Sequence, residues 1–446
     1  MNAAQAARNA LCPCGSGQRY KTCCGRVDRV EPRHATTVDA LLRAAFDAHR
    51  AGRNDASRSL YVRAIAHAGG RLPDAEHMLG VLALGEGDFE AALRALRDVT
   101  RRYAPAPPEA IGNLAIAVAA LLSNRVTVET EERWLGYLAW RGAASSRAAA
   151  PRGRVSVVVP SYNHARYVDA ALDSLLQQTR PPDEIVVIDD GSTDASPSRV
   201  RAFGARAGDR VRIVLRENRG AAATINEAIR LSTGDWVHIL NSDDRFTPDR
   251  LEAMGRALAS AGASWGFSRC RFVDAAGTEL APGASAQADN QRRAFDSVGA
   301  HDTLGMAFVA GNVATTSGTL AFSRGLFDRL GGFRDFRYVH DWDFCLRASL
   351  EDEPAFAPRE HYEYRLHGSN TFTASYAGTH SETAAMLRDF HRQAQSIAAP
   401  ANPYAPAAAV WGRLLAVRTI EAGGAVVLPP GVVDSLADAI LVELAR

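Results

Sequence analysis

The chain has 446 residues, of which 47% are apolar and 23% are charged, and its net charge is +1. This length is too great for one ordinary core, and the near-zero charge gives no reason to expect a nucleic acid or an anionic membrane as a partner. Because no apolar run reaches the roughly 20 residues that span a bilayer and the N-terminus lacks the apolar core of a signal peptide, we expect a cytoplasmic protein without a transmembrane segment, with peripheral attachment to the inner membrane left open.

The first 30 residues contain a cysteine cluster with the sequence CPCGSGQRYKTCCG. In a chain without a secretory signal, clustered cysteines favour a metal over disulfides, and four thiolates form the closed tetrahedral set of a structural zinc site. The predicted Zn²⁺ ligands are Cys12, Cys14, Cys23 and Cys24. The alternative is a chance cluster of reduced thiols. The string resembles the SEC-C motif, which implies a zinc-binding module over residues 1–30 that docks onto a protein partner.

Residues 36–140 have a helical pattern that repeats loosely with a period of about 35 residues. The pattern resembles tetratricopeptide repeats, which implies stacked helix pairs with small residues at their crossings. The alternative is an unrelated helical bundle. Residues 143–153 are small or polar and predict a linker, while residues 381–446 predict a helical, Ala-rich extension.

From residue 154 to about residue 380, strand-like runs alternate with helical patterns, which is typical of an α/β fold with a parallel sheet. Three of the runs end abruptly in polar clusters: Val155–Asn163, Ile185–Asp194 and Trp236–Asp244. Runs this apolar predict strands that are buried on both faces. Because ligands bind beyond the carboxyl ends of such strands, we expect the three polar ends to meet in one acidic crevice, suited to a divalent cation and a nucleotide sugar.

Several motifs in this region resemble those of inverting family 2 glycosyltransferases. They are PSYNHARYVDAALDSLLQQT, VVIDDGSTD, NRGAAATINEAI, STGDWVHILNSDD, GGF and HDWDFCLR. The resemblance implies a Rossmann-like domain of the GT-A fold over residues 154–380. It also implies transfer of a sugar from a nucleotide-diphosphate-sugar to an acceptor hydroxyl. The acceptor stays open between a glycan, a lipid-linked molecule and a polypeptide.

A metal site is predicted at the end of the third apolar run. A divalent cation stabilises a diphosphate leaving group as a Lewis acid, and hard oxygen ligands hold Mg²⁺ or Mn²⁺. The resemblance implies Asp243 as the metal ligand and His367 as the C-terminal histidine that helps to hold the ion. Families of this type usually carry Asp-x-Asp, whereas this chain has Asn241, which brings no charge. The remaining histidines show no ligand spacing.

Displacement at the anomeric carbon also requires a base that accepts the proton of the attacking hydroxyl. In HDWDFCLR, the resemblance implies Asp341 as this general base, with Asp343 as the alternative. By helical spacing, Asp341 shares a face with Phe344 and Cys345. Asp343 therefore points elsewhere and is expected to form a cap or an ion pair.

The resemblance implies further contacts to the donor or the acceptor. Pro160, Ser161 and Tyr162 resemble the wall of a nucleoside pocket, Asp190 resembles a carboxylate that contacts the base or ribose, and Arg365 is suited to phosphate. The other predicted substrate-binding residues are Asn218, Gly220, Asn241, Asp244 and Gly318. Asp194 is either a nucleotide contact or a helix cap.

Two other functions are alternatives to this one. The first is a catalytically weak or inactive nucleotide-sugar-binding scaffold that recruits partners through the zinc motif and the helical repeats. The second is a nucleotidyltransferase, which would need a Gly-rich basic loop after the first strand, and PSYNHARY has none.

Overall fold

The computed structural model describes residues 35–103, 107–123, 136–137, 139–141, 153–368, 370, 376–420 and 431–444. The chain divides into two compact units: Met1–Thr127 with Ala416–Arg446, and Val128–Leu415. The predicted zinc ligands and the predicted linker up to residue 152 lie outside the described residues. The domain boundaries drawn from the sequence stay predictions.

The first unit is built from helices. They are α2 (Ala35–Arg50), α3 (Asn54–His67), α4 (Pro73–Gly85), α5 (Phe89–Arg102), α6 (Pro108–Ser123) and α19 (Val432–Leu444). Consecutive helices pack on one another, and a Cβ at Gly80 of α4 would lie 2.5 Å from Cγ of Leu96 on α5. Arg97 of α5 donates to both carboxylate oxygens of Asp438 at 2.7 and 2.8 Å, which fixes α19 against α5. The expected helices are present, and their relation to tetratricopeptide repeats stays a prediction.

The second unit contains an eight-stranded sheet of order β3-β2-β1-β4-β7-β6-β8-β5. Its strands are β1 (Val155–Ser161), β2 (Glu184–Asp190), β3 (Val211–Arg216), β4 (Trp236–Ile239), β5 (Arg245–Phe246), β6 (Trp265–Val273), β7 (Leu320–Ser323) and β8 (Ala355–Arg365). The first four strands are parallel, and three of them, β1, β2 and β4, are the strands that the buried apolar runs predicted. However, β7 is antiparallel to both of its neighbours, so the sheet is mixed.

The expectation of an all-parallel sheet was therefore wrong for the second half of the domain. The reason lies in the connection between β6 and β7, which contains α12 (Ala286–Ser297) and α13 (Leu304–Ala310). Alternating strand and helix patterns do not specify strand direction, because a connection with two helices can return the chain to either end of the sheet.

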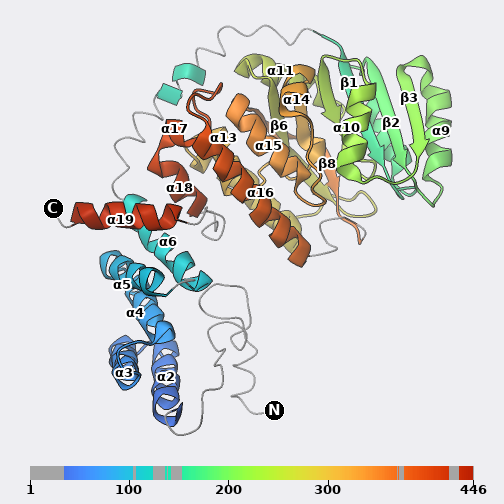
Figure 1. Ribbon diagram of the computed structural model, residues 1–446. Coiled ribbons are helices and arrows are strands. Elements are labelled where there is room, and N and C mark those ends of the chain that lie inside the picture. The colour runs from blue at the N-terminus through green and yellow to red at the C-terminus, as the bar shows by residue number, and fades with distance from the viewer. Residues whose placement is uncertain are drawn as a thin grey trace, which may run out of the picture. The chain divides into compact units, whose positions relative to one another are not determined.

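Helices cover both faces of this sheet (Figure 1). Helices α8 (Val168–Leu176), α9 (Ser196–Ala207) and α11 (Arg250–Ala261) cover one face, where apolar side chains of β1 and β2 form the core with them. Helices α10 (Ala221–Leu231), α14 (Arg324–Leu330) and α15 (His340–Glu351) cover the other. On that face Phe333 stacks on Phe344 with ring centroids 4.3 Å apart. This packing fixes the position of α15, which carries the predicted base.

The chain after β8 continues as α16 (Tyr376–Ser396), α17 (Ala408–Trp411) and α18 (Arg413–Thr419). Helix α16 packs on α15, so the helical region that follows the sheet begins as part of the second unit. Within the described part of the chain, we find no helix with the length and apolar character needed to cross a bilayer.

Candidate functional site

The polar ends of the parallel strands lie side by side, as the sequence predicted. The register pairs Ser161 at the end of β1 with Asp189 of β2, and Asp190 of β2 with Arg216 at the end of β3. The pairing of β1 with β4 brings the turn after Ile239 to the same edge. This is the edge at which ligands bind in α/β sheets.

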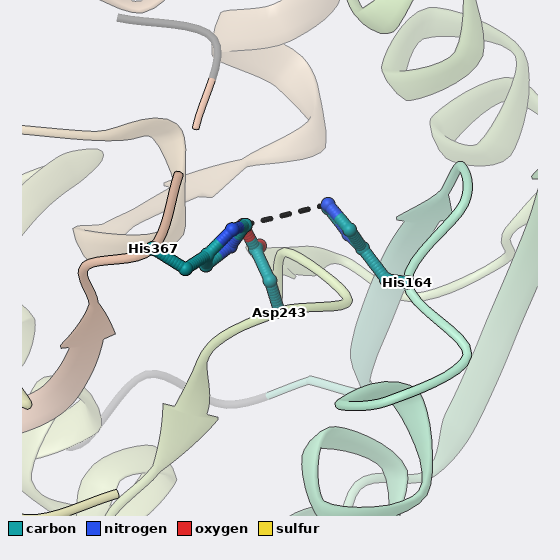
Figure 2. Close-up of side chains that lie close together, drawn as sticks. All are labelled: His164, Asp243 and His367. Atoms are coloured by element: carbon teal, nitrogen blue, oxygen red, sulfur yellow. Dashed lines mark hydrogen bonds and ion pairs between the residues drawn. The ribbon is translucent and has the colours of Figure 1, made fainter. Parts of the chain in front are cut away.

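Three side chains from separate segments converge there: His164, Asp243 and His367 (Figure 2). Nε2 of His367 lies 3.1 Å from Oδ2 of Asp243, and Nε2 of His164 lies 3.7 Å from the same oxygen. One potential ligand atom from each residue falls within 4.8 Å of those of the other two. Two imidazole nitrogens and one carboxylate oxygen form a chemically suitable donor set for a divalent metal ion. The residues present therefore fit a metal.

The sequence predicted Asp243 and His367 in this site, but it did not predict His164 beside them. Local spacing could not reveal it, because His164 follows β1 and meets Asp243 only through the pairing of β1 with β4. A signal was nevertheless present in the sequence. His164 directly follows the polar cluster that ends the run Val155–Asn163, and such clusters were expected to meet.

The neighbouring carboxylates Asp243 and Asp244 have opposite electrostatic environments. Burial acts to raise the pKa of Asp243, but His164 and His367 outweigh it and hold that pKa below its ordinary value. Burial, together with the charge of Asp243, raises the pKa of Asp244 well above its ordinary value. Asp243 is therefore the member of the pair that favours ionisation and is suited to hold a cation.

Four residues that were predicted to contact the substrate are buried or make hydrogen bonds within the protein, around the turn that carries Asp243. Asp244 accepts from the Tyr362 hydroxyl at 2.8 Å and from the backbone N–H of Arg365 at 2.8 Å. The Arg365 guanidinium donates to the backbone carbonyl of Asp243 at 2.9 Å. Asn241 donates to Thr316 Oγ1 at 2.8 Å. These bonds support the turn that carries Asp243.

Gly318, the fourth of these residues, is buried against the same tyrosine. A Cβ at this position would lie 1.9 Å from Oη of Tyr362, so only glycine fits there. Its carbonyl accepts a hydrogen bond from the buried Arg250 at 2.9 Å. The absence of a side chain therefore serves the packing of Tyr362.

The two carboxylates of HDWDFCLR have different partners. Asp343 is 1% exposed and pairs with Arg347 at 2.9 Å and with Arg334, which confirms the expected ion pair. Asp341 is 7% exposed and pairs with neither arginine in the described structure. Burial raises its pKa, although His340 and the backbone N–H of Trp342 act in the opposite direction. A carboxylate whose pKa is raised in this way is suited to general base chemistry.

Tyr364 connects Asp341 electrostatically to the metal-binding turn. The pKa of Tyr364 is raised well above its ordinary value, first by burial and then by the carboxylates of Asp244, Asp243 and, more weakly, Asp341. One tyrosine thus experiences the charge of the predicted metal ligand and of the predicted base.

The predicted nucleoside residues lie at the ends of β1, β2 and β3. Asp190 accepts from the backbone N–H groups of Arg219 and Gly220 at 2.8 and 2.9 Å and pairs with Arg216. Asn218 lies close against Gly191, where a Cβ would come within 2.7 Å of the Asn218 nitrogen. Asp190 therefore orders the loop that follows β3.

The end of β1 presents a different surface. Ser161 is buried, whereas Tyr162 is 47% exposed, an unusual exposure for a large ring, and Pro160 is intermediate. Asp194 accepts from the backbone N–H groups of Ala165 and Ser196 at 2.9 and 2.8 Å. These bonds favour the alternative in which Asp194 is a helix cap, and they also stabilise the loop. Tyr162 is the predicted nucleoside contact that is best placed to meet a ligand in solution.

Two segments of the chain match known family models. Residues 156–315 match the family model described as Glycosyl transferase family 2, and residues 8–26 match the SEC-C motif. The matched region includes His164 and Asp243 but ends before Asp341 and His367.

Two curated relatives are similar to part of this chain. The chain is 35% identical over 167 residues to the succinoglycan biosynthesis protein ExoU of Rhizobium meliloti, covering 37% of this chain and 45% of ExoU. It is 32% identical over 127 residues to the putative teichuronic acid biosynthesis glycosyltransferase TuaG of Bacillus subtilis, covering 28% of this chain and 50% of TuaG. The chain thus matches half or less of the length of these relatives.

Among solved structures, the chain is similar to TarS 1–349 of S. aureus in complex with UDP-GlcNAc. The TM-score is 0.46 at 17% identity, and the alignment covers 58% of this chain and 71% of the other. This likeness is too low to carry an argument about function, so the assignment of the region rests on the family match.

Proposed function

We propose that the chain is an inverting, metal-assisted glycosyltransferase that moves a sugar from a nucleotide-diphosphate-sugar to an acceptor hydroxyl. The main support is the group formed by His164, Asp243 and His367 at the carboxyl edge of the parallel strands. This edge belongs to the region that matches family 2. Two relatives are named for teichuronic acid and succinoglycan biosynthesis, so a glycan is the first acceptor to test.

Asp243 and His367 are the proposed ligands of Mn²⁺ or Mg²⁺. When bound, the ion supplies Lewis-acid stabilisation of the diphosphate leaving group. Asp244, Asn241, Arg365 and Gly318 support the turn that carries Asp243 through the internal contacts described above. Pro160, Ser161, Tyr162, Asp190, Asn218 and Gly220 are proposed to form or order the nucleoside side of the site.

Asp341 is proposed as the general base. The acceptor oxygen attacks the anomeric carbon from the face opposite to the diphosphate, the bond from that carbon to the diphosphate oxygen breaks, and the hydroxyl proton passes to the carboxylate of Asp341. Burial supports this role because it raises the pKa of Asp341. The ion pairs of Asp343 with Arg334 and Arg347 support giving this role to Asp341.

The N-terminal match to the SEC-C motif supports a structural zinc ion held by the four clustered cysteines. We propose that this module and the helices of the first unit bind a protein partner or a large acceptor. The same features would serve a scaffold without activity, which is the second candidate function.

A donor screen with purified full-length protein separates the two functions. Release of the nucleoside diphosphate is followed with UDP-, GDP- and dTDP-sugars in the presence of Mn²⁺ or Mg²⁺. Release from one donor that is lost in both Asp341→Asn and Asp243→Ala supports the transferase, provided that His361→Asn, a histidine paired with Asp249 instead, retains activity. No release and no donor binding by calorimetry would favour a scaffold that recruits partners and has also lost nucleotide-sugar binding.

A further inference from the structure

His164 is the member of the metal-binding group that the pattern of motifs did not predict. Its Nε2 lies 3.7 Å from Oδ2 of Asp243, the oxygen that also faces Nε2 of His367. Ligand atoms that bind one ion side by side are about 3 Å apart when each bond is about 2.1 Å long. The two contacts to Asp243 are close to that separation, so a small movement would let all three atoms bind one ion.

The orientation of the His164 ring is set by a second contact. Nδ1 of His164 lies 2.8 Å from Oγ of Ser242, the residue before Asp243. Metal-binding histidines almost always form a hydrogen bond through their other ring nitrogen, and this bond orients the ring. With Nδ1 engaged by Ser242, it is Nε2 that faces Asp243.

The loop that carries His164 is held in an unusual backbone conformation. Asn163, immediately before it, has φ of 53°, and Thr315 is the only other described residue besides glycine with a positive φ. Such a conformation costs free energy and persists only where the surroundings enforce it. The backbone N–H of Asn163 donates to Ser192 Oγ at 2.8 Å, and the side-chain oxygen of Asn163 accepts from the backbone N–H of Thr193 at 2.8 Å.

The backbone of the next two residues is fixed as well. The N–H of His164 donates to Ser196 Oγ at 3.0 Å, and that of Ala165 donates to Asp194 at 2.9 Å. The loop after β1 is thus anchored on the loop after β2 at four points. Because the backbone is fixed on both sides of His164, little entropy remains to be lost when its imidazole binds an ion.

We propose that His164 is the third protein ligand of the metal site and that it makes the site selective for transition-metal ions over Mg²⁺. This inference deepens the proposed function and rests on its assignment of Asp243 and His367. Imidazole nitrogen suits first-row transition metals, whereas Mg²⁺ prefers oxygen ligands. Two imidazoles and one carboxylate therefore favour Mn²⁺ and later first-row ions. The remaining coordination positions are left for substrate oxygens or water.

Binding of Mn²⁺ alone tests the inference without measuring activity. Electron paramagnetic resonance of free Mn²⁺ gives its dissociation constant for the full-length chain, and added Mg²⁺ competes for the same site. Mn²⁺ is the suitable probe because the thiolates of the N-terminal cysteines select softer metals. The variants are His164→Asn, which removes the ligand, and His164→Asp, which replaces nitrogen with oxygen. His361→Asn is the matched control, since His361 lies 3.1 Å from Asp249 in an ordinary His–Asp pair.

We expect the wild type to bind Mn²⁺ far more tightly than Mg²⁺. His164→Asn should weaken Mn²⁺ binding at least about 10-fold, since the loss of outer partners of metal ligands already costs about 10- to 100-fold. His164→Asp should retain Mn²⁺ binding and be competed by Mg²⁺ at lower concentrations, a shift that a merely destabilised fold would not produce. His361→Asn should match the wild type.

Two results would count against the proposal in different ways. Unchanged Mn²⁺ affinity and unchanged competition by Mg²⁺ in both His164 variants, with binding lost in Asp243→Asn, would overturn the role of His164 and leave the proposed function standing. A wild type that binds no Mn²⁺ even with nucleoside diphosphate present would overturn the metal assignment of the proposed function as well.

Discussion

Nε of Arg347 lies 2.9 Å from Oδ2 of Asp343, four residues earlier on the same helix, and both side chains are buried. Arg347 also donates to the backbone carbonyl oxygens of Leu330 and Gly332, each at 2.8 Å. Arg347, held by Asp343, thereby joins α15 to the end of α14 and to the segment after it. This buried pair holds in place the helix turn that presents Asp341.

Asp343→Asn should therefore act on stability. Removing one partner of a buried ion pair leaves the other charge uncompensated, which costs about 3–5 kcal/mol. Urea denaturation should show this loss in the free energy of unfolding. A variant that remains as stable as the wild type would contradict the structural role of the pair and reopen Asp343 as a candidate base.

Asp341→Asn should act on catalysis. We expect it to keep the fold and donor binding, and to lose transfer by about 10²–10⁴-fold, the usual contribution of a general base. Steady-state kinetics with the donor identified in the screen measure this loss, and calorimetry checks donor affinity. Turnover equal to that of the wild type would remove Asp341 from the mechanism.

The raised pKa of Asp341 also has a consequence for stability. Burial favours the protonated carboxyl in the folded state, so the folded pKa lies above its ordinary value of 3.8. As pH rises from 3.8 toward the folded pKa, the folded state binds more protons than the unfolded state, and the free energy of unfolding falls. Asp341→Asn lacks this penalty.

Melting temperatures measured across that pH range for both proteins provide the test. Asp341→Asn should become increasingly more stable than the wild type as pH rises, and the difference should level off above the folded pKa. A difference that does not change with pH would show that burial does not disfavour the ionised form of Asp341.

The packing of Gly318 against Tyr362 leads to a fourth prediction. Gly318→Ala should cost about 1–3 kcal/mol, because the added methyl group would overlap the tyrosine ring and hydroxyl. Chemical denaturation measures the cost. Gly299→Ala is the control, since a Cβ at Gly299 would meet no atom within 4 Å. Equal stability of the two variants would show that the tyrosine moves without penalty.

The sequence predicted those parts of the site that depend on strand order in the first half of the sheet. Buried apolar runs predicted β1, β2 and β4, and parallel pairing brings their polar ends together whatever the details of the loops. The family resemblance together with helical spacing separated Asp341 from Asp343. These features depend on local periodicity, which the sequence records directly.

The interior roles of Asp244 and Arg365 could not be predicted in the same way. Both are charged residues near a predicted crevice, and their charge suggested ligand contacts. Their actual partners, Tyr362 and backbone carbonyls, come from β8 and from turns far away in the chain. Such contacts depend on the register and direction of strands in the mixed half of the sheet, which periodicity does not specify.

The metal-binding group also bears on how the domain is made. Its members follow β1, β4 and β8, so the group draws on both the first and the last strand of the sheet in chain order. During synthesis from the N-terminus, the group cannot form before β8 has left the ribosome and joined the sheet. An ion that binds only the folded chain stabilises it by mass action. Metal uptake at the proposed site should therefore be a late event in biogenesis, and it would signal directly that the whole domain has folded.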